Sequence, residues 1–357
     1  MLLVEPAPQA KNVTVHLFAA ARGVDETKTS GLRHLLEHLC VKGPDGKLDE
    51  RLESNGAFLR ARTFRDALDV QIDVPPGKLQ IAFDALSEVL QTGGWTATDI
   101  AREAGVIEQE LALQPDDAAL TSALWRQAYG GNGADPMGDL ATIQATTPEA
   151  LEATRRATFA CGNLVLVIEG PIGLTVGTKQ GVAFLSKLTT GKSDLGVVRI
   201  PKSGPGRVEV EAYGEARGVP VPPLSDPICV ARLCAALAIA SELQDAYMTY
   251  TPSALNGMVV VGQVGEVGKL GKFIDSLDDG AADGLLERGR ILGARWAARQ
   301  VDSPEASGFT RGLLMSRNVR FHFESVQEAM AHVSVAEFRA AIASFDSSHA
   351  FVSVGLP

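Results

Sequence analysis

Apolar and polar residues alternate strictly over residues 68–74, Leu-Asp-Val-Gln-Ile-Asp-Val. A period of two is typical of a β-strand, and residues 13–18 form a second strand-like run. Apolar positions recur at helical spacing over residues 79–92, 97–113 and 147–158. These strands and helices do not alternate regularly enough for a doubly wound sheet. The pattern therefore predicts an α+β fold whose sheets are rich in antiparallel pairs.

One helix–strand pattern occurs twice in the chain. Residues 146–149 and 334–337 each begin a helix with a capping-box pattern, and each helix leads to a phenylalanine and then to an apolar strand. The offset is 188 residues between the two glutamates of these boxes and 186 between Phe159 and Phe345. A nearly constant offset predicts a duplicated domain, although two unrelated helix–strand endings are the alternative.

The connection between the two predicted domains falls in a stretch rich in Gly, Pro, Ser and Lys. Such a composition suits a flexible connector. We therefore expect an N-terminal domain over residues 1–190, a linker over 191–206 and a shortened C-terminal domain without a metal site over 207–357.

Composition narrows the functional class. The chain is 45% hydrophobic and 21% charged, which is ordinary for a packed domain, and no apolar run approaches the roughly 20 residues that cross a bilayer. The first six residues do not resemble a signal peptide, which predicts a cytoplasmic protein, or a periplasmic one if a leader was removed. A net charge of −10 and the lack of a basic stripe argue against nucleic acid. The four cysteines show no C-x-x-C pairing and are interpreted as free thiols.

The residues that carry candidate chemistry lie at positions 34–38, His-Leu-Leu-Glu-His. At about 100° per residue, His34, Glu37 and His38 share one face of a helix and the neighbouring leucines the opposite face. Two imidazoles four residues apart can bind one metal ion, and the glutamate between them can take a proton from an attacking water. The alternative is two surface histidines on an amphipathic helix.

A catalytic zinc site needs a third protein ligand. Glu103 and Glu110 are seven residues apart and share one face of a later predicted helix, whereas Glu108 points to the other side. On spacing alone, a solvated acidic face is the simpler explanation of this pair.

Taken together, these segments resemble the inverzincin peptidases of the pitrilysin, insulinase and mitochondrial processing peptidase family, peptidase family M16. That family carries H-x-x-E-H on one helix and E-x-x-x-x-x-x-E on a later one. The resemblance implies that His34, His38 and Glu110 hold one Zn²⁺ per chain. It also implies that Glu37 is the general base and that Glu103 is a supporting carboxylate of the catalytic site.

Two further strings resemble the family. Residues 52–63 contain a small-residue loop followed by Ala-Arg-Thr, and residues 135–138 resemble the family's P-x-G loop. The resemblance implies that the peptide substrate adds to a sheet edge and contacts Arg60, Ala61 and Thr63. Family members usually have Asn where this chain has Arg60, a difference that favours acidic substrate residues nearby.

The second half departs from the family pattern. Family enzymes place an arginine seven residues before a tyrosine in a later domain, where both hold the substrate. Tyr247 or Tyr250 could match that tyrosine, but Ala240 and Leu243 stand where the arginine would be. The alternative is that both tyrosines only pack in the fold.

The resemblance implies two duplicated α/β-sandwich domains that form half of a clamshell. It further implies a zinc-dependent metalloendopeptidase that hydrolyses extended peptides in an enclosed chamber. Because the arginine is missing, we expect the zinc-bearing subunit of a heterodimer whose second subunit supplies the Arg/Tyr pair; a homodimer is the other arrangement. The alternative function is a non-catalytic scaffold or peptide-binding subunit of a processing complex.

Overall fold

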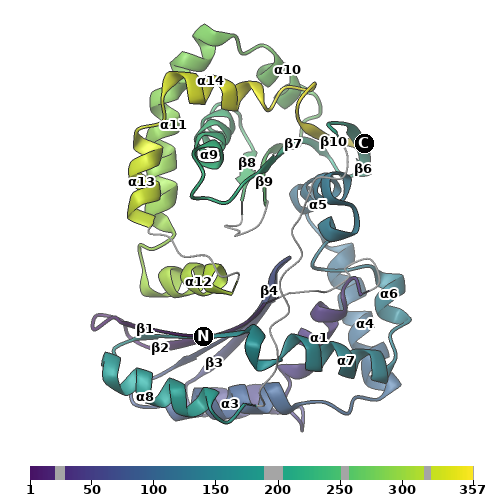
Figure 1. The fold of residues 1–357 in the computed structure, drawn as a ribbon. Helices are drawn as coiled ribbons and strands as arrows, with labels where there is room; N and C mark the ends of the chain where they lie inside the picture. Colours follow the sequence, from purple (N-terminus) through teal and green to yellow (C-terminus); the bar gives the residue numbers. More distant parts are fainter. Residues whose placement is uncertain (21–28, 189–203, 251–256, 317–322, 357) are drawn as a thin grey trace. The chain divides into compact units, whose positions relative to one another are not determined.

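The computed structural model describes residues 1–20, 29–188, 204–250, 257–316 and 323–356. The chain forms two compact units, each built around a five-stranded sheet (Figure 1). Unit 1 consists of Met1–Ala112, Asp135–Val197 and Val301–Asn318. Unit 2 consists of Leu113–Ala134, Val198–Gln300 and Val319–Pro357. Each unit therefore contains one segment from the opposite half of the chain.

The sheet of unit 1 has the strand order β1-β5-β2-β4-β3. Its strands are β1 (Leu2–Pro6), β2 (Val13–Ala20), β3 (Phe58–Thr63), β4 (Ala67–Val74) and β5 (Leu164–Gly170). Only β1 and β5 pair in parallel; the other pairs are antiparallel. The two runs predicted as strands are β2 and β4, and β3 forms an edge of the described sheet. The antiparallel-rich α+β fold is thus confirmed.

Helices cover both faces of this sheet. They are α1 (Leu32–Cys40), α2 (Leu48–Glu53), α3 (Leu79–Gln91), α4 (Ala97–Ala112), α6 (Leu140–Gln144), α7 (Pro148–Thr158), α8 (Leu174–Leu185) and α12 (Pro304–Met315), with a 3₁₀ turn at Cys161–Asn163. α3 and α8 lie on one face and α12 lies on the other (Figure 1). The main apolar core of the unit lies between the sheet and the helices on the same face as α3 and α8. α12 packs on β5, β2 and β1 over a smaller cluster that includes Phe18 and Leu313.

Strand β4 differs from the simple expectation for an alternating strand, because both of its faces are buried. Its polar face carries Asp69, Gln71 and Asp73. Thr14 donates to Asp73 over 2.7 Å, and His16 Nδ1 lies 3.2 Å from Asp69 Oδ1. Buried polar side chains are tolerated where they find such partners. The alternation therefore predicted the strand correctly. The residues that bury its polar face belong to other segments of the chain, which the alternation does not identify.

Unit 2 repeats the topology of unit 1. Its strands β6 (Arg207–Glu211), β7 (Gly214–Val221), β8 (Ala246–Thr249), β9 (Gly257–Val264) and β10 (Phe351–Leu356) have the order β6-β10-β7-β9-β8. In both sheets the order is first, fifth, second, fourth and third strand, with the parallel pair at the same end. This shared order confirms the duplicated domain.

The helices of unit 2 form a layered cover. They are α5 (Asp116–Tyr129), a 3₁₀ turn at Gly130–Gly133, α9 (Pro227–Ser241), α10 (Lys269–Asp275), α11 (Asp279–Arg299), α13 (Phe323–Ala331) and α14 (Val335–Ala343). α5 packs on β7 and β10, α9 packs on β9 and β8, and α11, α13 and α14 pack on α9. Cys229 and Cys234 of α9 are fully buried.

The exchange of one helix between the halves was not foreseen. α5 precedes residue 190 but belongs to unit 2, and α12 follows residue 207 but belongs to unit 1. The predicted linker over 191–206 lies mostly in residues 189–203, outside the described residues. The division at 190 and 206 therefore stays a prediction about the duplicated halves of the sequence, whereas packing groups the segments differently.

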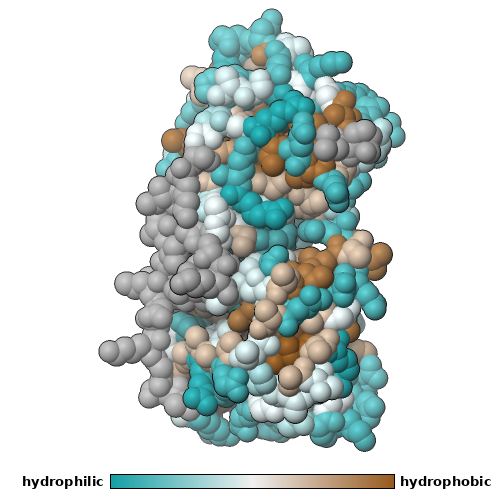
Figure 2. Space-filling view, turned by 90° about the vertical axis from the view of Figure 1, so that its right-hand side faces the viewer, coloured by the Kyte–Doolittle hydropathy of each residue, from teal (hydrophilic) through white to brown (hydrophobic). Residues whose placement is uncertain are grey.

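Among the described residues, no helix combines the length and the apolarity that spanning a bilayer requires. On the face drawn in Figure 2, hydrophobic residues lie in separate patches among hydrophilic ones. Scattered apolar residues of this kind are ordinary on folded proteins.

Candidate metal centre

Helix α1 carries the predicted motif and is anchored by its leucines. Leu35 and Leu36 are fully buried, while His34 and His38 project from another side of the helix, with 8% and 14% of their side chains exposed. The helix is therefore fixed by its apolar face, and its two imidazoles are held beside the neighbouring α4.

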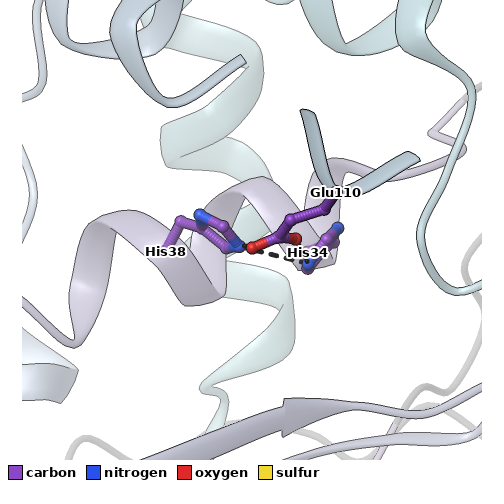
Figure 3. A group of neighbouring side chains, drawn as sticks. All are labelled: His34, His38 and Glu110. Carbon is purple, nitrogen blue, oxygen red and sulfur yellow. Dashed lines mark hydrogen bonds and ion pairs between the residues drawn. The ribbon is translucent and has the colours of Figure 1, made fainter. Parts of the chain in front are cut away.

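The two histidines and Glu110 of α4 converge on one point, as Figure 3 shows. His34 Nε2 and His38 Nε2 lie 3.2 Å apart. Glu110 Oε2 lies 3.4 Å from His34 Nε2 and 3.5 Å from His38 Nε2. Ligands about 2.0–2.1 Å from a tetrahedral zinc ion are roughly 3.3 Å from one another. The three spacings therefore fit a zinc ion with three protein ligands.

The polar neighbours of the two Nδ1 atoms support the same conclusion. His34 Nδ1 donates to the carbonyl oxygen of Met137 over 3.1 Å, because a carbonyl can only accept. On the other ring, His38 Nδ1 lies 3.7 Å from Glu103 Oε2. The proton on His34 Nδ1 leaves a lone pair on its Nε2, and the same tautomer of His38, with Nδ1 toward the Glu103 carboxylate, leaves a second lone pair. Two lone pairs and the Glu110 carboxylate then face one another, an arrangement that a cation stabilises.

Glu103 lies behind His38 and is almost fully buried, with 1% of the residue exposed. Its Oε1 accepts hydrogen bonds from Lys42 Nζ and from Arg102 Nε, the latter over 3.3 Å. Its Oε2 remains directed at His38. The two cations thus compensate a buried carboxylate and orient it toward the His38 ring.

Glu37 stands on α1 next to the metal ligands. Its Oε2 accepts a hydrogen bond from the hydroxyl of Thr63 over 2.5 Å. Burial raises the pKa of Glu37 above the usual value of a glutamate, although the Thr63 hydrogen bond and nearby His34 act in the opposite direction. A carboxylate with a raised pKa is a better proton acceptor near neutral pH than an exposed one.

The end of strand β3 is fastened to helix α1. Arg33, which is 4% exposed, donates from Nη1 to the carbonyl oxygen of Phe64 over 3.2 Å and from Nη2 to that of Arg65 over 3.1 Å. Thr63 is the last residue of β3. The buried guanidinium therefore holds the strand end against the helix that carries the glutamate and the two histidines.

The loop that presents the Met137 carbonyl depends on two glycines in close approach. Gly31, at the start of α1, has φ +85°, and Gly138 has φ +95°. A Cβ added to Gly138 would lie 2.2 Å from the Cα of Gly31. Neither backbone conformation nor available space accepts a larger residue, so the glycines hold the 135–138 loop close to the first turn of α1.

We expect Gly138→Ala to destabilise the protein by about 2–4 kcal/mol, since the side chain adds a clash to an unfavourable φ. Gly46→Ala is the matched control, because Gly46 has φ +73° but nothing within 4 Å of an added Cβ. It should cost only about 1 kcal/mol. Urea unfolding measures both. Equal losses for the two variants would contradict the close approach of Gly138 to Gly31.

The remaining predicted site residues have separate places. Arg60 and Ala61 lie on β3, Arg60 with its side chain 57% exposed. In unit 2, the Tyr247 hydroxyl donates to the carbonyl oxygen of Asp117 over 3.2 Å, and the Tyr250 ring lies 6.0 Å from the ring of Trp296. These contacts favour the packing interpretation of both tyrosines, and their role toward substrate stays a prediction.

Sequence reasoning missed two contributors to this centre. Lys42 lies four residues after His38, a helical spacing that could have suggested a shared side. The contact from Met137 is a main-chain carbonyl, so no residue type at that position signals it. The Cys40 thiol, two residues after His38, donates to the Glu37 carbonyl oxygen over 3.5 Å, and burial raises its pKa strongly.

Part of the chain is similar in sequence to known proteins. Residues 2–135 match the family model described as insulinase (peptidase family M16). The chain is 27% identical over 191 residues to a probable mitochondrial-processing peptidase subunit beta of Arabidopsis thaliana, covering 51% of this chain and 36% of that protein. It is 23% identical over 219 residues to an uncharacterized zinc protease of Mycobacterium tuberculosis, covering 58% and 49%. The matched part is thus less than half of each relative.

Solved structures share the fold over the whole chain. A protease from Helicobacter pylori has a TM-score of 0.81 at 14% identity, covering 100% of this chain and 96% of that one. A structure described as a peptidase M16 inactive domain from Pseudomonas fluorescens has a TM-score of 0.78 at 17% identity, covering 100% and 95%. At such identities the likeness shows the fold alone.

Proposed function

We propose that this chain, whose residues 2–135 match the model of peptidase family M16, is a zinc-dependent endopeptidase acting on extended peptides. One observation carries the proposal: two imidazole nitrogens and one carboxylate oxygen converge at 3.2–3.5 Å, beside the half-buried Glu37, which is not one of the three. A purely structural zinc site would be closed by four protein ligands. Among the described residues, only these three form a potential metal group.

When bound, zinc would supply a Lewis acid that polarises a carbonyl oxygen and favours deprotonation of water. Glu37 would accept the proton of the attacking water and later donate it to the leaving amine. The Thr63 hydroxyl holds one carboxylate oxygen of Glu37 and so orients the other. The Met137 carbonyl holds the His34 ring by a hydrogen bond, and the Glu103 carboxylate lies 3.7 Å from Nδ1 of the His38 ring, where it would orient that ring.

Strand β3 would supply the substrate site. It is an edge strand of the described sheet, and its last residue contacts the proposed base. An extended peptide can pair with such an edge through main-chain hydrogen bonds. The proposed contacts of Arg60, Ala61 and Thr63 with substrate follow from this pairing. Thr63 would have a second role, because its hydroxyl also orients Glu37.

The proposed assembly is a heterodimer in which this chain bears zinc. Its support is the absence of an arginine seven residues before Tyr247 or Tyr250, together with relatives whose names call them subunits. A second chain of the same fold would supply the missing Arg/Tyr pair; a homodimer is the other possible pairing. The proposed location is the cytoplasm or, with a removed leader, the periplasm.

The purified chain should contain about one zinc ion per molecule, because three ligands with two oriented imidazoles form the site. Metal content is measured by mass spectrometry, and cleavage of an unstructured quenched-fluorescence peptide is measured before and after chelation. Zinc with cleavage that chelation abolishes and zinc restores supports the proposal.

The same experiment separates the alternative function. A non-catalytic scaffold or peptide-binding subunit is favoured by the missing arginine and by the fold shared with a structure described as inactive. Zinc without cleavage, also after addition of candidate partner subunits, would support that alternative. A chain that binds no zinc would contradict the metallopeptidase proposal altogether.

A further inference from the structure

Two arginines stand side by side on one face of the edge strand. In β3, the residues Phe58, Arg60 and Arg62 are exposed, and the intervening residues are half-buried. The side chains of Arg60 and Arg62 are 57% and 46% exposed. They belong to the same face because residues two apart in a strand point to the same side.

Acidic residues hold these arginines from behind. Arg60 Nη2 lies 3.4 Å from Asp73 Oδ2, and Arg62 Nη2 lies 3.4 Å from Asp69 Oδ2. The side chains of Asp73 and Asp69 are only 12% and 0% exposed, so the outward-facing charge at this edge is that of the guanidinium groups. The strand β4 that carries both carboxylates pairs with β3 on its inner side.

Arg62 is further restrained by neighbouring side chains. Its guanidinium lies 4.6 Å from the centre of the Phe309 ring and donates to Gln71 Oε1 over 3.1 Å. A guanidinium that is already stacked and hydrogen-bonded loses less conformational entropy when a ligand pairs with it. Arg62 is therefore already oriented to pair with a side chain of a peptide strand that adds beside β3.

The pair lies close to the proposed reaction site along the strand. Thr63, the last residue of β3, contacts Glu37; Arg62 precedes it by one residue and Arg60 by three. At ~3.3 Å per residue, both arginines lie within about 10 Å of that contact along the strand.

We propose that Arg60 and Arg62 select peptides with acidic side chains at two positions separated by one residue, near the cleaved bond. This inference rests on the proposed binding of an extended peptide to β3. Side chains directly across two paired strands lie on the same face, and opposite charges there attract. A peptide with two such acidic residues places both carboxylates next to the two guanidinium groups.

The net charge of the whole chain gives a competing expectation. A protein with charge −10 repels any acidic peptide at long range, wherever the acidic residues stand in the peptide. The arginine pair, in contrast, recognises acidic residues only at two particular positions of the bound peptide, which are separated by one residue. Peptides of identical composition and net charge therefore separate the two effects.

The test measures binding of fluorescently labelled peptides to the full-length, zinc-loaded Glu37→Gln variant by anisotropy. One series carries two glutamates at positions i and i+2, and an isomeric series carries them at i and i+1, scanned along the peptide. We expect one register of the first series to bind roughly four- to twentyfold more tightly than its all-glutamine counterpart, from two cross-strand ion pairs. The i, i+1 isomers should gain no more than one pair, and lysines at the preferred positions should weaken binding.

Arg60→Gln and Arg62→Gln should each remove roughly half of the preference on a logarithmic scale, without abolishing binding of the all-glutamine peptide. Lys179→Gln is the control, since Lys179 is exposed on α8, which packs on β1 at the opposite edge of the sheet. It should leave the preference unchanged. Unfolding midpoints check that the variants fold.

Two results would overturn the inference and can be told apart. If peptides bind equally in the two isomeric series, or if the preference survives both arginine variants, the role of the arginine pair is contradicted. The proposed peptide site on β3 is not affected by these results. Failure of every peptide to bind contradicts the proposed peptide site on β3 as well.

Discussion

Replacing Glu37 by glutamine should lower peptide cleavage by about 10²- to 10⁴-fold while the protein keeps its zinc. Glutamine has nearly the same shape and can still accept a hydrogen bond from Thr63, but its amide cannot take a proton from water. Glu37 is not among the three converging ligand atoms, so metal binding should persist. Cleavage of a quenched-fluorescence peptide and zinc content are measured on the same preparation.

Glu53→Gln serves as the control, because Glu53 is exposed at the end of α2 and contacts none of the metal ligands in the described part of the chain. It should cleave like the wild type. A Glu37→Gln variant that retains both zinc and full activity would contradict the role of Glu37 as the base.

Replacing Glu110 by glutamine should produce the largest loss of zinc. The Glu110 carboxylate supplies the only anionic ligand atom of the three, at 3.4 and 3.5 Å from the two imidazole nitrogens. An amide oxygen carries no charge and is a weaker zinc ligand. We expect zinc affinity to fall by more than the roughly 10- to 100-fold typical of changes behind the ligands. Competition with a fluorescent chelator measures the affinity.

Two variants on the same helix make this result specific. Glu108→Gln should leave zinc affinity unchanged, because Glu108 is exposed on another side of α4. Glu103→Gln should give an intermediate loss, about 10- to 100-fold, since Glu103 acts through the His38 ring. Equal affinities for the Glu110 and Glu108 variants would show that Glu110 is not the third ligand.

Much of the metal centre could be predicted because the spacing of its residues along two helices places them on shared faces. His34, Glu37 and His38 share a helix face by periodicity alone, and Glu110 follows Glu103 by two helical turns. Even so, spacing left Glu110 open to interpretation as a solvated residue, and only the family resemblance assigned it. The structure then brought its carboxylate to the two imidazoles, across 72 residues of sequence.

Other parts depend on contacts that no local pattern records. The alternation of residues 68–74 predicted strand β4, but a wet outer face was the simple expectation. Both faces are buried because β3 supplies arginines and α12, some 230 residues later, covers the neighbouring strands. Periodicity identifies a helix and its apolar side, but it does not say which sheet the helix will cover.

Because α5 and α12 each belong to the unit formed mainly by the other half of the chain, the sheet of unit 1 is synthesised long before the helix that covers one of its faces. Unit 1 holds every residue of the metal centre, and among the described residues α12, which ends at Met315, is the helix that covers one face of its sheet. As the chain leaves the ribosome, the strands of this sheet are complete at Gly170, about 130 residues before that helix is made. During this interval the face with Phe18, Val165 and Val167 lacks its cover, and exposed apolar sheet favours association with other chains. We therefore expect the nascent chain to be prone to aggregation until α12 has been synthesised and covers this face.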